Sequence, residues 1–212
     1  MLQIVIATRN RHKVRELTSL LPKAGIRWSS LRQFPHVSSV RESGRSFDEN
    51  ALRKARAVAR ETGCLALADD SGLEVEALGG APGIRSARFA GSHGDDAANN
   101  RKLLRALRRV PLAQRRARYR CSLALAGPSR LIALVHGEWK GRIALAPAGR
   151  NGFGYDPLFL VPRLGKTVGQ LPARVKRRLS HRAASARQLR PILRRLVRQI
   201  ERPDKTTRRV RR

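Results

Sequence analysis

In CLALADDSGLEVEALGG, residues 64–80, a short apolar run leads directly into two adjacent aspartates, and this order predicts the centre of the fold. The run Leu65–Ala68 predicts a buried β-strand, with Asp69 and Asp70 at its C-terminal end, where α/β proteins place functional groups. Four acids fall within residues 69–76, and the whole quoted stretch contains no Lys or Arg. Because adjacent carboxylates repel each other, this cluster indicates that a positive charge lies beside it.

The rest of the chain is strongly basic, with 46 Lys plus Arg, 15 Asp plus Glu and a formal net charge of +31. Segment 101–120 has nine basic residues and no acid, and segment 171–212 has sixteen basic residues and two acids. Such a chain attracts polyanions, whether nucleic acid, an anionic membrane or phosphorylated small molecules. No RNA-binding aromatic pattern, zinc finger or heptad-linked basic region accompanies this charge. The Arg-rich helices are therefore interpreted mainly as solvated faces, with non-specific nucleic-acid attraction left open.

Strands and helices interleave along the chain, which predicts an α/β fold with a mixed sheet. The clearest helix begins at Ser46, where Glu49 completes a capping box, and ends at Gly63. Pro191 is expected to kink or break the last helix, which Ser180 caps. Further helices are expected over residues 11–21, 96–109 and 181–200. The expected strands cover residues 2–8, 26–31, 65–68, 119–126, 130–138, 141–146 and 153–161.

The length of 212 residues permits one large domain or two closely packed lobes. No apolar run approaches the roughly 18–20 residues that span a bilayer. The N-terminal sequence MLQIVIATRNRHK lacks the basic region and the cleavage site of a signal peptide. We therefore expect a cytoplasmic protein that does not bind a membrane.

The opening strand passes at once into a helix, and Thr8, Asn10 and Lys13 lie at this junction. The free N–H groups and the positive dipole end of a helix N-terminus suit phosphate oxygens, and Lys13 adds a point charge. The alternative interpretation is a helix cap followed by a surface lysine.

The aspartate pair favours Mg²⁺, a hard cation that prefers carboxylate oxygens and keeps substrate phosphates among its ligands. Glu42 is the candidate that completes the ligand set, and Glu49 is a weaker one. The alternative is that Asp69 caps the next turn and that Asp70 is solvated.

Two later segments have the chemistry of a base-binding pocket. In GRNGFGYDPLF, residues 149–159, the glycines permit close approach to a flat ligand, and Phe153 or Tyr155 could stack on a base. In LSHR, residues 179–182, a histidine and an arginine begin a helix, and Lys176 lies just before them. The alternatives are a bulged strand with core aromatics and an exposed polar turn.

Four separated segments together closely resemble the inosine triphosphate pyrophosphatase family, the Ham1-like pyrophosphatases of non-canonical purine nucleoside triphosphates. They are IATRNRHKVREL, ESGRSFDENALRKA, ALADDSGLEVEALGGAPGIRSARFAG, and GRNGFGYDPLFLVP followed by LSHR. The resemblance extends from about Leu2 to Leu196 in the right order, and its long central block is very specific.

This resemblance implies an elongated α/β fold with a mixed central sheet, two lobes and a cleft between them. On this basis residues 1–200 form a single domain of two lobes, and residues 201–212 form a basic, flexible tail beyond the family match. It further implies a homodimer that hydrolyses ITP, dITP and XTP to the monophosphate and pyrophosphate with Mg²⁺. A pyrophosphatase of another nucleotide preference and a nucleic-acid-binding protein are the alternatives.

The resemblance also assigns roles, position by position. Asp70 matches the general base and, with Glu42, the metal ligands, and Ser71 matches a substrate contact. The remaining matched substrate-binding residues are Thr8, Arg9, Asn10, Arg11, His12, Lys13, Phe153, Gly154, Tyr155, Asp156, Lys176, His181 and Arg182. Arg182, together with His181, is expected to donate to the 6-oxo group of hypoxanthine or xanthine, which adenine lacks. The chain departs from the family pattern at Arg9, Arg85, Gln170 and Val175, none of which is a proposed catalytic group.

Overall fold

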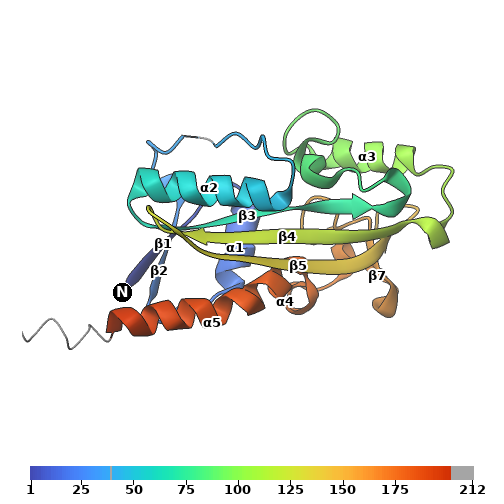
Figure 1. Cartoon of the computed structure of the whole chain (residues 1–212). Coiled ribbons are helices and arrows are strands. Elements are labelled where there is room, and N and C mark those ends of the chain that lie inside the picture. The colour runs from blue at the N-terminus through green and yellow to red at the C-terminus, as the bar shows by residue number, and fades with distance from the viewer. Residues whose placement is uncertain (39, 202–212) are drawn as a thin grey trace, which may run out of the picture.

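A computed structural model describes residues 1–38 and 40–201 of the chain. Over these residues the chain forms seven strands and five α-helices, and Figure 1 shows helices on both sides of one long sheet. The bounds are β1 Leu2–Ile6, α1 Arg11–Leu20, β2 Ile26–Ser30, α2 Phe47–Thr62, β3 Leu65–Val75, α3 Asp96–Ala106, β4 Arg116–Ala126, β5 Leu131–Ile143, β6 Phe159–Val161, β7 Lys166–Thr167, α4 Ala173–Leu179 and α5 His181–Glu201. In this described part, no helix has both the length and the apolar character that crossing a membrane requires.

The sheet is mixed, in the order β2-β1-β3-β4-β5-β6-β7, which confirms the predicted α/β class. β1 pairs in parallel with β2 and β3, whereas the neighbours from β3 to β7 pair antiparallel. The pairing of β1 with β3 ends where Ile6 lies opposite Leu67, but β3 continues to Val75. Beyond Leu67, β4 is the strand partner of β3 within the described residues, and loop residues contact the other edge, where Glu74 forms a bridge with Pro82 and the N–H of Leu73 donates to the Ser86 hydroxyl.

The two faces of the sheet carry side chains of different size. Leu67 of β3 and Leu123 and Leu125 of β4 pack on one face, in a core shared with α1 and α5. Ala66 and Ala124 point to the other face, in a core shared with α2. Successive side chains of a strand point to opposite faces, so the alternation of Leu and Ala in the sequence sets which helix covers which face.

A further core lies toward the other end of β3, where Leu73 packs with Phe159 of β6 and Leu103 of α3. Leu67 belongs to the first core and Leu73 to this one, so residues 68–72 of β3 lie between them. Asp69 and Asp70 are in this segment of the strand. The division of the chain into two lobes stays a prediction.

The boundaries of α2 are as predicted. The Ser46 hydroxyl accepts a hydrogen bond from the N–H of Glu49 at 3.1 Å, and Gly63 ends the helix with a φ of 66°. The capping box is only half formed, because the Glu49 carboxylate accepts from the N–H of Arg45 at 2.9 Å rather than from that of Ser46.

Two strand predictions are wrong in length. The predicted strand 65–68 continues through Asp69 and Asp70, because β3 keeps its antiparallel pairing with β4 as far as Val75. The two predicted strands 130–138 and 141–146 belong to one strand, β5, because Gly137 and Gly141 pair with β4 instead of forming a turn.

The C-terminal part also differs from expectation. Residues 153–158 form turns, so that β6 begins only at Phe159, and α4 precedes α5 where no helix was expected. α5 runs through the exposed Pro191 without a break, because Leu189 and Leu193 on either side are buried in the core. The predicted basic tail falls, beyond Glu201, outside the described residues.

Gly137 of β5 determines how closely α5 approaches the sheet. A Cβ atom at this position would collide with the carbonyl oxygen of His181 and would lie 2.6 Å from the backbone nitrogen of Ser185. Glycine here therefore allows the first turn of α5, which carries His181 and Arg182, to lie directly on the sheet.

We expect Gly137→Ala to lower the free energy of unfolding by about 2–3 kcal/mol, because the added methyl group meets backbone atoms that cannot move aside. Urea denaturation measures this loss. Gly127→Ala is the matched control, since its Cβ would lie 3.3 Å from the end of the Leu65 side chain and 3.9 Å from the carbonyl oxygen of Arg130, which is an ordinary contact. Equal stability of the two variants would contradict the close approach of α5.

Candidate active site

Asp69 and Asp70 point to opposite faces of the sheet because they are neighbours in a strand. Asp69 contacts Lys13 of α1 and Arg182 of α5, whereas Asp70 contacts Lys54 of α2. The positive charge expected beside the aspartates is therefore present, but different side chains supply it on the two faces. Each carboxylate has its own positive partners, on its own side of the sheet.

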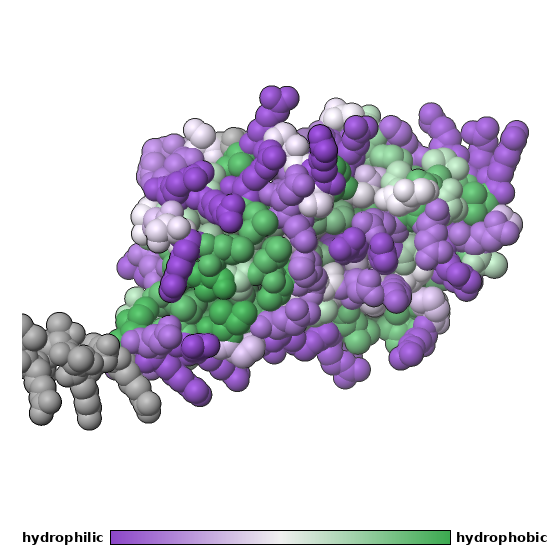
Figure 2. Space-filling model, in the orientation of Figure 1, coloured by the Kyte–Doolittle hydropathy of each residue, from purple (hydrophilic) through white to green (hydrophobic). Residues whose placement is uncertain are grey.

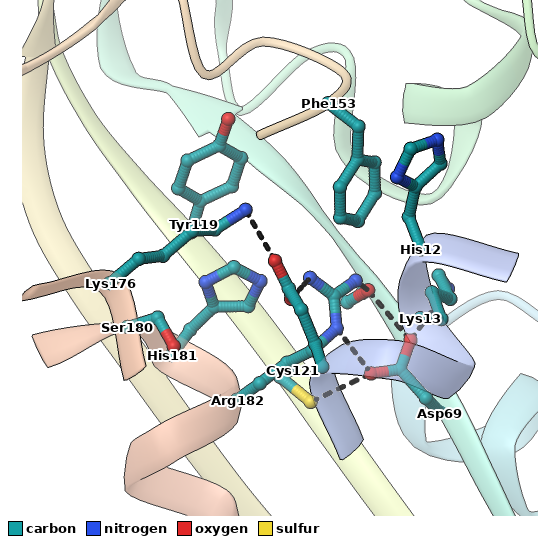
Figure 3. A network of polar contacts seen from close by, with 12 residues as sticks. His12, Lys13, Asp69, Tyr119, Cys121, Phe153, Lys176, Ser180, His181 and Arg182 are labelled. Atoms are coloured by element: carbon teal, nitrogen blue, oxygen red, sulfur yellow. Dashed lines mark hydrogen bonds and ion pairs between the residues drawn. The ribbon is translucent and has the colours of Figure 1, made fainter. Parts of the chain in front are cut away.

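Asp69 is fully buried and lies at the centre of a polar network (Figure 3). Its Oδ1 lies 2.5 Å from Lys13 Nζ, and its Oδ2 accepts from Arg182 Nε at 2.9 Å. The Ser71 hydroxyl donates to Oδ1 at 2.8 Å, and the Cys121 thiol donates to Oδ2 at 3.3 Å. These contacts link α1, α5 and β4 to β3. Asp69 therefore holds the first turns of α1 and α5 in place beside β3.

Asp69 remains ionised despite its burial. Burial alone would raise the pKa of its carboxyl, but attraction to Arg182 and Lys13 outweighs this cost and holds the pKa well below its usual range.

On the other face, Lys54 joins the two carboxylates that the sequence assigns to the metal. Its Nζ lies 2.6 Å from Asp70 Oδ1 and 3.0 Å from Glu42 Oε1. Asn50 donates to Asp70 Oδ2 at 3.2 Å, and Arg88 lies 3.2 Å from Glu42 Oε2. The structure thus brings Glu42 and Asp70 together.

The two carboxylates differ in acidity. Burial raises the pKa of Asp70, and Lys54 only partly opposes this, whereas for Glu42 the attraction of Lys54 outweighs burial and lowers the pKa. Asp70 is therefore the stronger base of the two. Burial by itself would lower the pKa of Lys54, but attraction to the two carboxylates outweighs burial and raises the pKa above its usual value. Lys54 therefore stays charged.

The donor set at Glu42 and Asp70 fits a hard divalent cation. Both groups supply carboxylate oxygens, and Mg²⁺ is commonly held by one or two carboxylates together with water and substrate phosphates. Within residues 1–38 and 40–201 no three His, Cys, Asp or Glu side chains form a cluster that could hold a metal. A cation here would therefore depend on the substrate for its further ligands.

Glu42 and Asp70 line a cleft cavity of about 510 Å³, to which the end of β1 and the start of α1 contribute Thr8, Asn10 and Lys13. Asn10 is the N-cap of α1, and its Oδ1 accepts from the N–H groups of His12 at 2.9 Å and of Lys13 at 3.1 Å. The cap interpretation is therefore correct for Asn10. Lys13 lies in the cleft and is not a solvated surface lysine.

Of the other residues of this segment, Arg9 also lines the cleft, whereas Arg11 and His12 do not. Arg9 donates to the carbonyl of Val37 at 2.8 Å and lies at the rim of the cleft. Arg11 lines a separate surface hollow. His12 stacks on Phe153, with 5.1 Å between the ring centroids. The structure therefore brings Thr8, Arg9, Asn10 and Lys13 to the cleft but not Arg11 or His12.

A smaller cavity of about 110 Å³ adjoins the cleft and shares Asn10, Lys13 and Ser71 with it. Phe153 lies over two cations of this cavity, as Figure 3 shows, with its ring centroid 4.6 Å from Lys176 Nζ and 5.2 Å from Arg182 Cζ. Phe153 thus lines this cavity beside two cations, and the prediction that its ring stacks on a base stays a prediction.

Tyr155 and Asp156 lie at the inner wall of this cavity, and their polar groups bind the protein itself. The Tyr155 hydroxyl donates to the carbonyl of Ser86 at 2.9 Å. Asp156 accepts from the N–H of Phe153 at 2.9 Å and pairs with Lys176 at 2.5 Å. Both side chains therefore shape the loop, and the prediction that Tyr155 could stack on a base finds no support in its buried position.

His181 and Arg182 are buried at the start of α5, so the alternative of an exposed polar turn is wrong. Arg182 donates to Asp69, to Glu16 and to Ser71, which engages its three nitrogens. His181 stacks on Tyr119 at 4.7 Å, and its buried Nδ1 has no hydrogen-bond partner among the described residues. Burial, with the nearby Arg182, lowers the pKa of His181 well below its usual range, so its ring is neutral.

The Ham1 family model matches residues 4–192. The chain belongs to the Ham1 family. It is 49% identical to the dITP/XTP pyrophosphatase of Geobacillus kaustophilus, over 89% of this chain and 93% of that protein. It is 48% identical to the dITP/XTP pyrophosphatase of Desulforamulus reducens, over 92% of this chain and 97% of that one.

Solved Ham1 structures have the same fold. The HAM1 protein from Coxiella burnetii has a TM-score of 0.84 and 40% identity, covering 92% of this chain and 100% of that one. The Staphylococcus aureus Ham1 protein has a TM-score of 0.81 and 39% identity, covering 92% of this chain and 99% of that one. The roles of the individual residues in this Ham1 chain stay predictions.

Several residues of the site were not found from the sequence, among them Lys54, Asn50, Arg88 and Glu16. Lys54 and Asn50 lie one turn apart on the buried face of α2, among Ala51, Ala55 and Val58. Two polar residues on an apolar stripe were the available signal, because such groups need a buried partner. Glu16, which pairs with Lys176 at 2.5 Å and with Arg182 at 2.9 Å, gave no comparable signal.

We expect Asp69→Asn to destabilise the protein by about 3–5 kcal/mol at pH 7, since the amide leaves buried positive charges without a counter-charge. The folded-state pKa of Asp69 lies below its unfolded value of about 4, so its contribution is complete above that value and is lost as the pH falls through the folded-state pKa. The variant should therefore lose less stability than the wild type between pH 5 and pH 2.

Urea denaturation at a series of pH values measures both effects. Asp95→Asn is the control, because this exposed residue caps α3 and an amide keeps the cap. An Asp69→Asn variant as stable as the wild type at pH 7 would contradict the role given to this carboxylate.

Proposed function

We propose that the protein hydrolyses the non-canonical purine nucleoside triphosphates dITP, ITP and XTP to the nucleoside monophosphate and pyrophosphate. It is a nucleoside triphosphate pyrophosphatase, a hydrolase of a phosphoric anhydride bond. The observation that carries the proposal is the pair of adjoining cavities that share Asn10, Lys13 and Ser71. The larger offers carboxylates and cations to a triphosphate, and the smaller offers aromatic and polar groups to a base. The names of the relatives, dITP/XTP pyrophosphatases, support this assignment.

Glu42 and Asp70 are the residues that would hold Mg²⁺. The ion would neutralise charge on the phosphate oxygens as water attacks the α-phosphorus and the bond from that phosphorus to the bridging oxygen of the leaving pyrophosphate breaks. Lys54 and Arg88, which contact the same carboxylates, fix where the carboxylate oxygens face. The choice of Mg²⁺ over other hard divalent ions rests on the family resemblance and on the oxygen donors.

Asp70 is the general base of the proposed reaction. Its carboxylate faces the cleft, and burial raises its pKa, so it accepts a proton from the attacking water more readily than a solvated aspartate does. Asn50 and Lys54 each bind one of its oxygens and hold its orientation.

Lys13 and Thr8 bind the phosphates that leave. Lys13 is the cation of α1 that reaches into both cavities, and its pairing with Asp69 fixes its position. The leaving pyrophosphate therefore meets a preoriented ammonium group, which stabilises the charge that develops on it.

Selectivity for 6-oxo purines rests on His181 and Arg182. The neutral ring of His181 has an unpartnered Nδ1 among the described residues, and a donor there would pair with the oxo group. Arg182 keeps the surroundings positive while its nitrogens bind Asp69, Glu16 and Ser71. Adenine, with an amino group at C6, would leave the histidine donor unpaired in a closed pocket.

A cytoplasmic homodimer is part of the same proposal. Figure 2 shows an apolar area on the surface between α2 and α5, which offers an area for association. Within the described residues, β6 pairs with β5 only at Arg142 and Ile143, so the outer edge of the first part of β5 has no strand partner there.

Asp70→Asn should lower the turnover of dITP at least about a hundredfold, because it removes the base and a metal ligand together. Monophosphate and pyrophosphate are measured separately, with Mg²⁺, for a panel of canonical and non-canonical triphosphates. The control is Glu138→Gln on β5, an exposed carboxylate outside the cleft.

The wild type should release pyrophosphate from dITP, ITP and XTP at least about tenfold faster than from dATP. Near-normal turnover by Asp70→Asn would overturn the assignment of this residue. Release of phosphate in place of pyrophosphate would show that a different bond is cut.

A second function, non-specific binding of nucleic acid, is favoured by the exposed cations of α4 and α5. Arg174, Arg177 and Arg178 are exposed on α4, and Arg194 and Arg198 are exposed on α5. These helices have no acidic residue in their first turn, so the cations are not offset locally there. Such a surface attracts the phosphate backbone of either DNA or RNA.

Binding of a labelled single-stranded oligonucleotide should weaken steeply with salt and should survive Asp70→Asn. Replacing Arg194, Arg195 and Arg198 by Gln should reduce the slope of log affinity against log salt by about 2–3. Fluorescence anisotropy at several salt concentrations gives this slope. Salt-independent binding, or an unchanged slope in the triple variant, would reject this surface.

A further inference from the structure

Two side chains of α3 form hydrogen bonds with the backbone of one residue in the loop beside the smaller cavity. This cavity, which is proposed to bind the purine, is called the base cavity below. Asp96 Oδ2 accepts a hydrogen bond from the N–H of Gly154 at 2.6 Å. One turn further along α3, Asn100 Nδ2 donates to the carbonyl oxygen of Gly154 at 2.9 Å. Both backbone groups of a single glycine are therefore satisfied by residues four positions apart on one helix, which places them on the same face.

Gly154 is the neighbour in sequence of Phe153, the residue whose ring lines the base cavity. Gly154 has a φ of 65°, in the left-handed region that favours glycine, and Phe153 precedes it. The N–H of Phe153 is held by Asp156, and the hydroxyl of Tyr155 is held by the carbonyl of Ser86. Each residue from 153 to 155 is thus anchored separately, and α3 supplies the anchor at the centre.

The orientation of Phe153 depends on these anchors. Its ring lies within 4.6 Å of Lys176 Nζ and 5.2 Å of Arg182 Cζ, which requires the backbone of the loop to hold one path. A rotation of the Gly154 peptide would change the direction of the adjoining Phe153. The side chain of Asp96 itself also lines the base cavity.

We propose that Asp96 and Asn100 are positioning residues for the base, which act through Gly154 to hold Phe153 in place over the base cavity. This inference rests on the proposed function. The two residues contact the loop, and neither lines the cleft of Glu42 and Asp70, so they determine affinity for the base and not the rate of bond cleavage. Their loss should raise KM and leave kcat nearly unchanged.

The experiment compares Asn100→Ala, Asn100→Asp and Asp96→Ala with the wild type. Asn100→Asp has nearly the same shape but presents an oxygen to the Gly154 carbonyl in place of a donor. In all three variants KM for dITP should rise about tenfold, as expected for the loss of a buried hydrogen bond, with kcat within about threefold of the wild type. The affinity for IMP, measured by calorimetry, should fall in parallel, while inhibition by pyrophosphate should change less than about twofold.

Two further variants separate positioning from stability. Asp96→Asn keeps an oxygen that can accept from the Gly154 N–H, so it should restore most of the affinity for IMP that Asp96→Ala loses. Asp95→Ala removes the N-cap of α3 and leaves both contacts with Gly154, so it should lower the melting temperature without changing KM.

The outcomes distinguish this inference from the proposed function. A wild type that does not hydrolyse dITP would reject the proposed function itself. A wild type that does so, together with Asn100 variants of unchanged KM and unchanged affinity for IMP, would reject the positioning role. An equal rise of KM in Asp95→Ala would also reject it, because the effect would then come from the stability of α3.

Discussion

The alternation of side chains along β3 is the constraint on which the site depends. Once β3 continues past Leu67, residues 69 and 70 must face opposite sides of the sheet. Asp69 then meets α1 and α5, and Asp70 meets α2, because these helices already cover the two faces through the leucine and alanine rows. Two adjacent acids in the sequence therefore have different roles. Asp69 holds the architecture, and Asp70 faces the cleft.

The network around Asp69 explains why such a costly arrangement persists. Burying a carboxylate and two cations is unfavourable unless each polar atom finds a partner. Here the two oxygens of Asp69 receive Lys13, Arg182, Ser71 and Cys121, and Arg182 uses its remaining nitrogens on Glu16 and Ser71. A complete network of this kind tolerates little displacement, because moving one member leaves another buried and unpaired. The first turns of α1 and α5 are thereby held in register with β3, which places the cations of the base cavity and of the cleft relative to each other.

The fold class, the start and end of α2, and several polar residues of the cleft could be predicted from the sequence, because caps, apolar runs and motif order are local signals. The strand boundaries that depend on pairing with a neighbouring strand were predicted wrongly. The length of β3 follows from its continued pairing with β4, and the fusion of two expected strands into β5 follows from glycines that serve close approach rather than turns. Lys54 was missed for a related reason. Its position on the apolar stripe of α2 shows that it is buried, but only the tertiary structure shows that Glu42 and Asp70 are its partners.

Lys54 also bears on how an acidic cluster works inside a very basic protein. The cleft is lined by five Lys or Arg side chains and two carboxylates, so the acids do not make it negative. Lys54 takes Oδ1 of Asp70 and Oε1 of Glu42, while Asn50 and Arg88 take the other two oxygens. A divalent ion that binds both carboxylates must therefore share these oxygens with an ammonium, and the added positive charge would repel Lys54 unless anionic phosphates enter with it. The geometry thus favours binding of the metal and the triphosphate together over binding of the metal alone, and the surplus of cations in the cleft favours the anion that makes this possible.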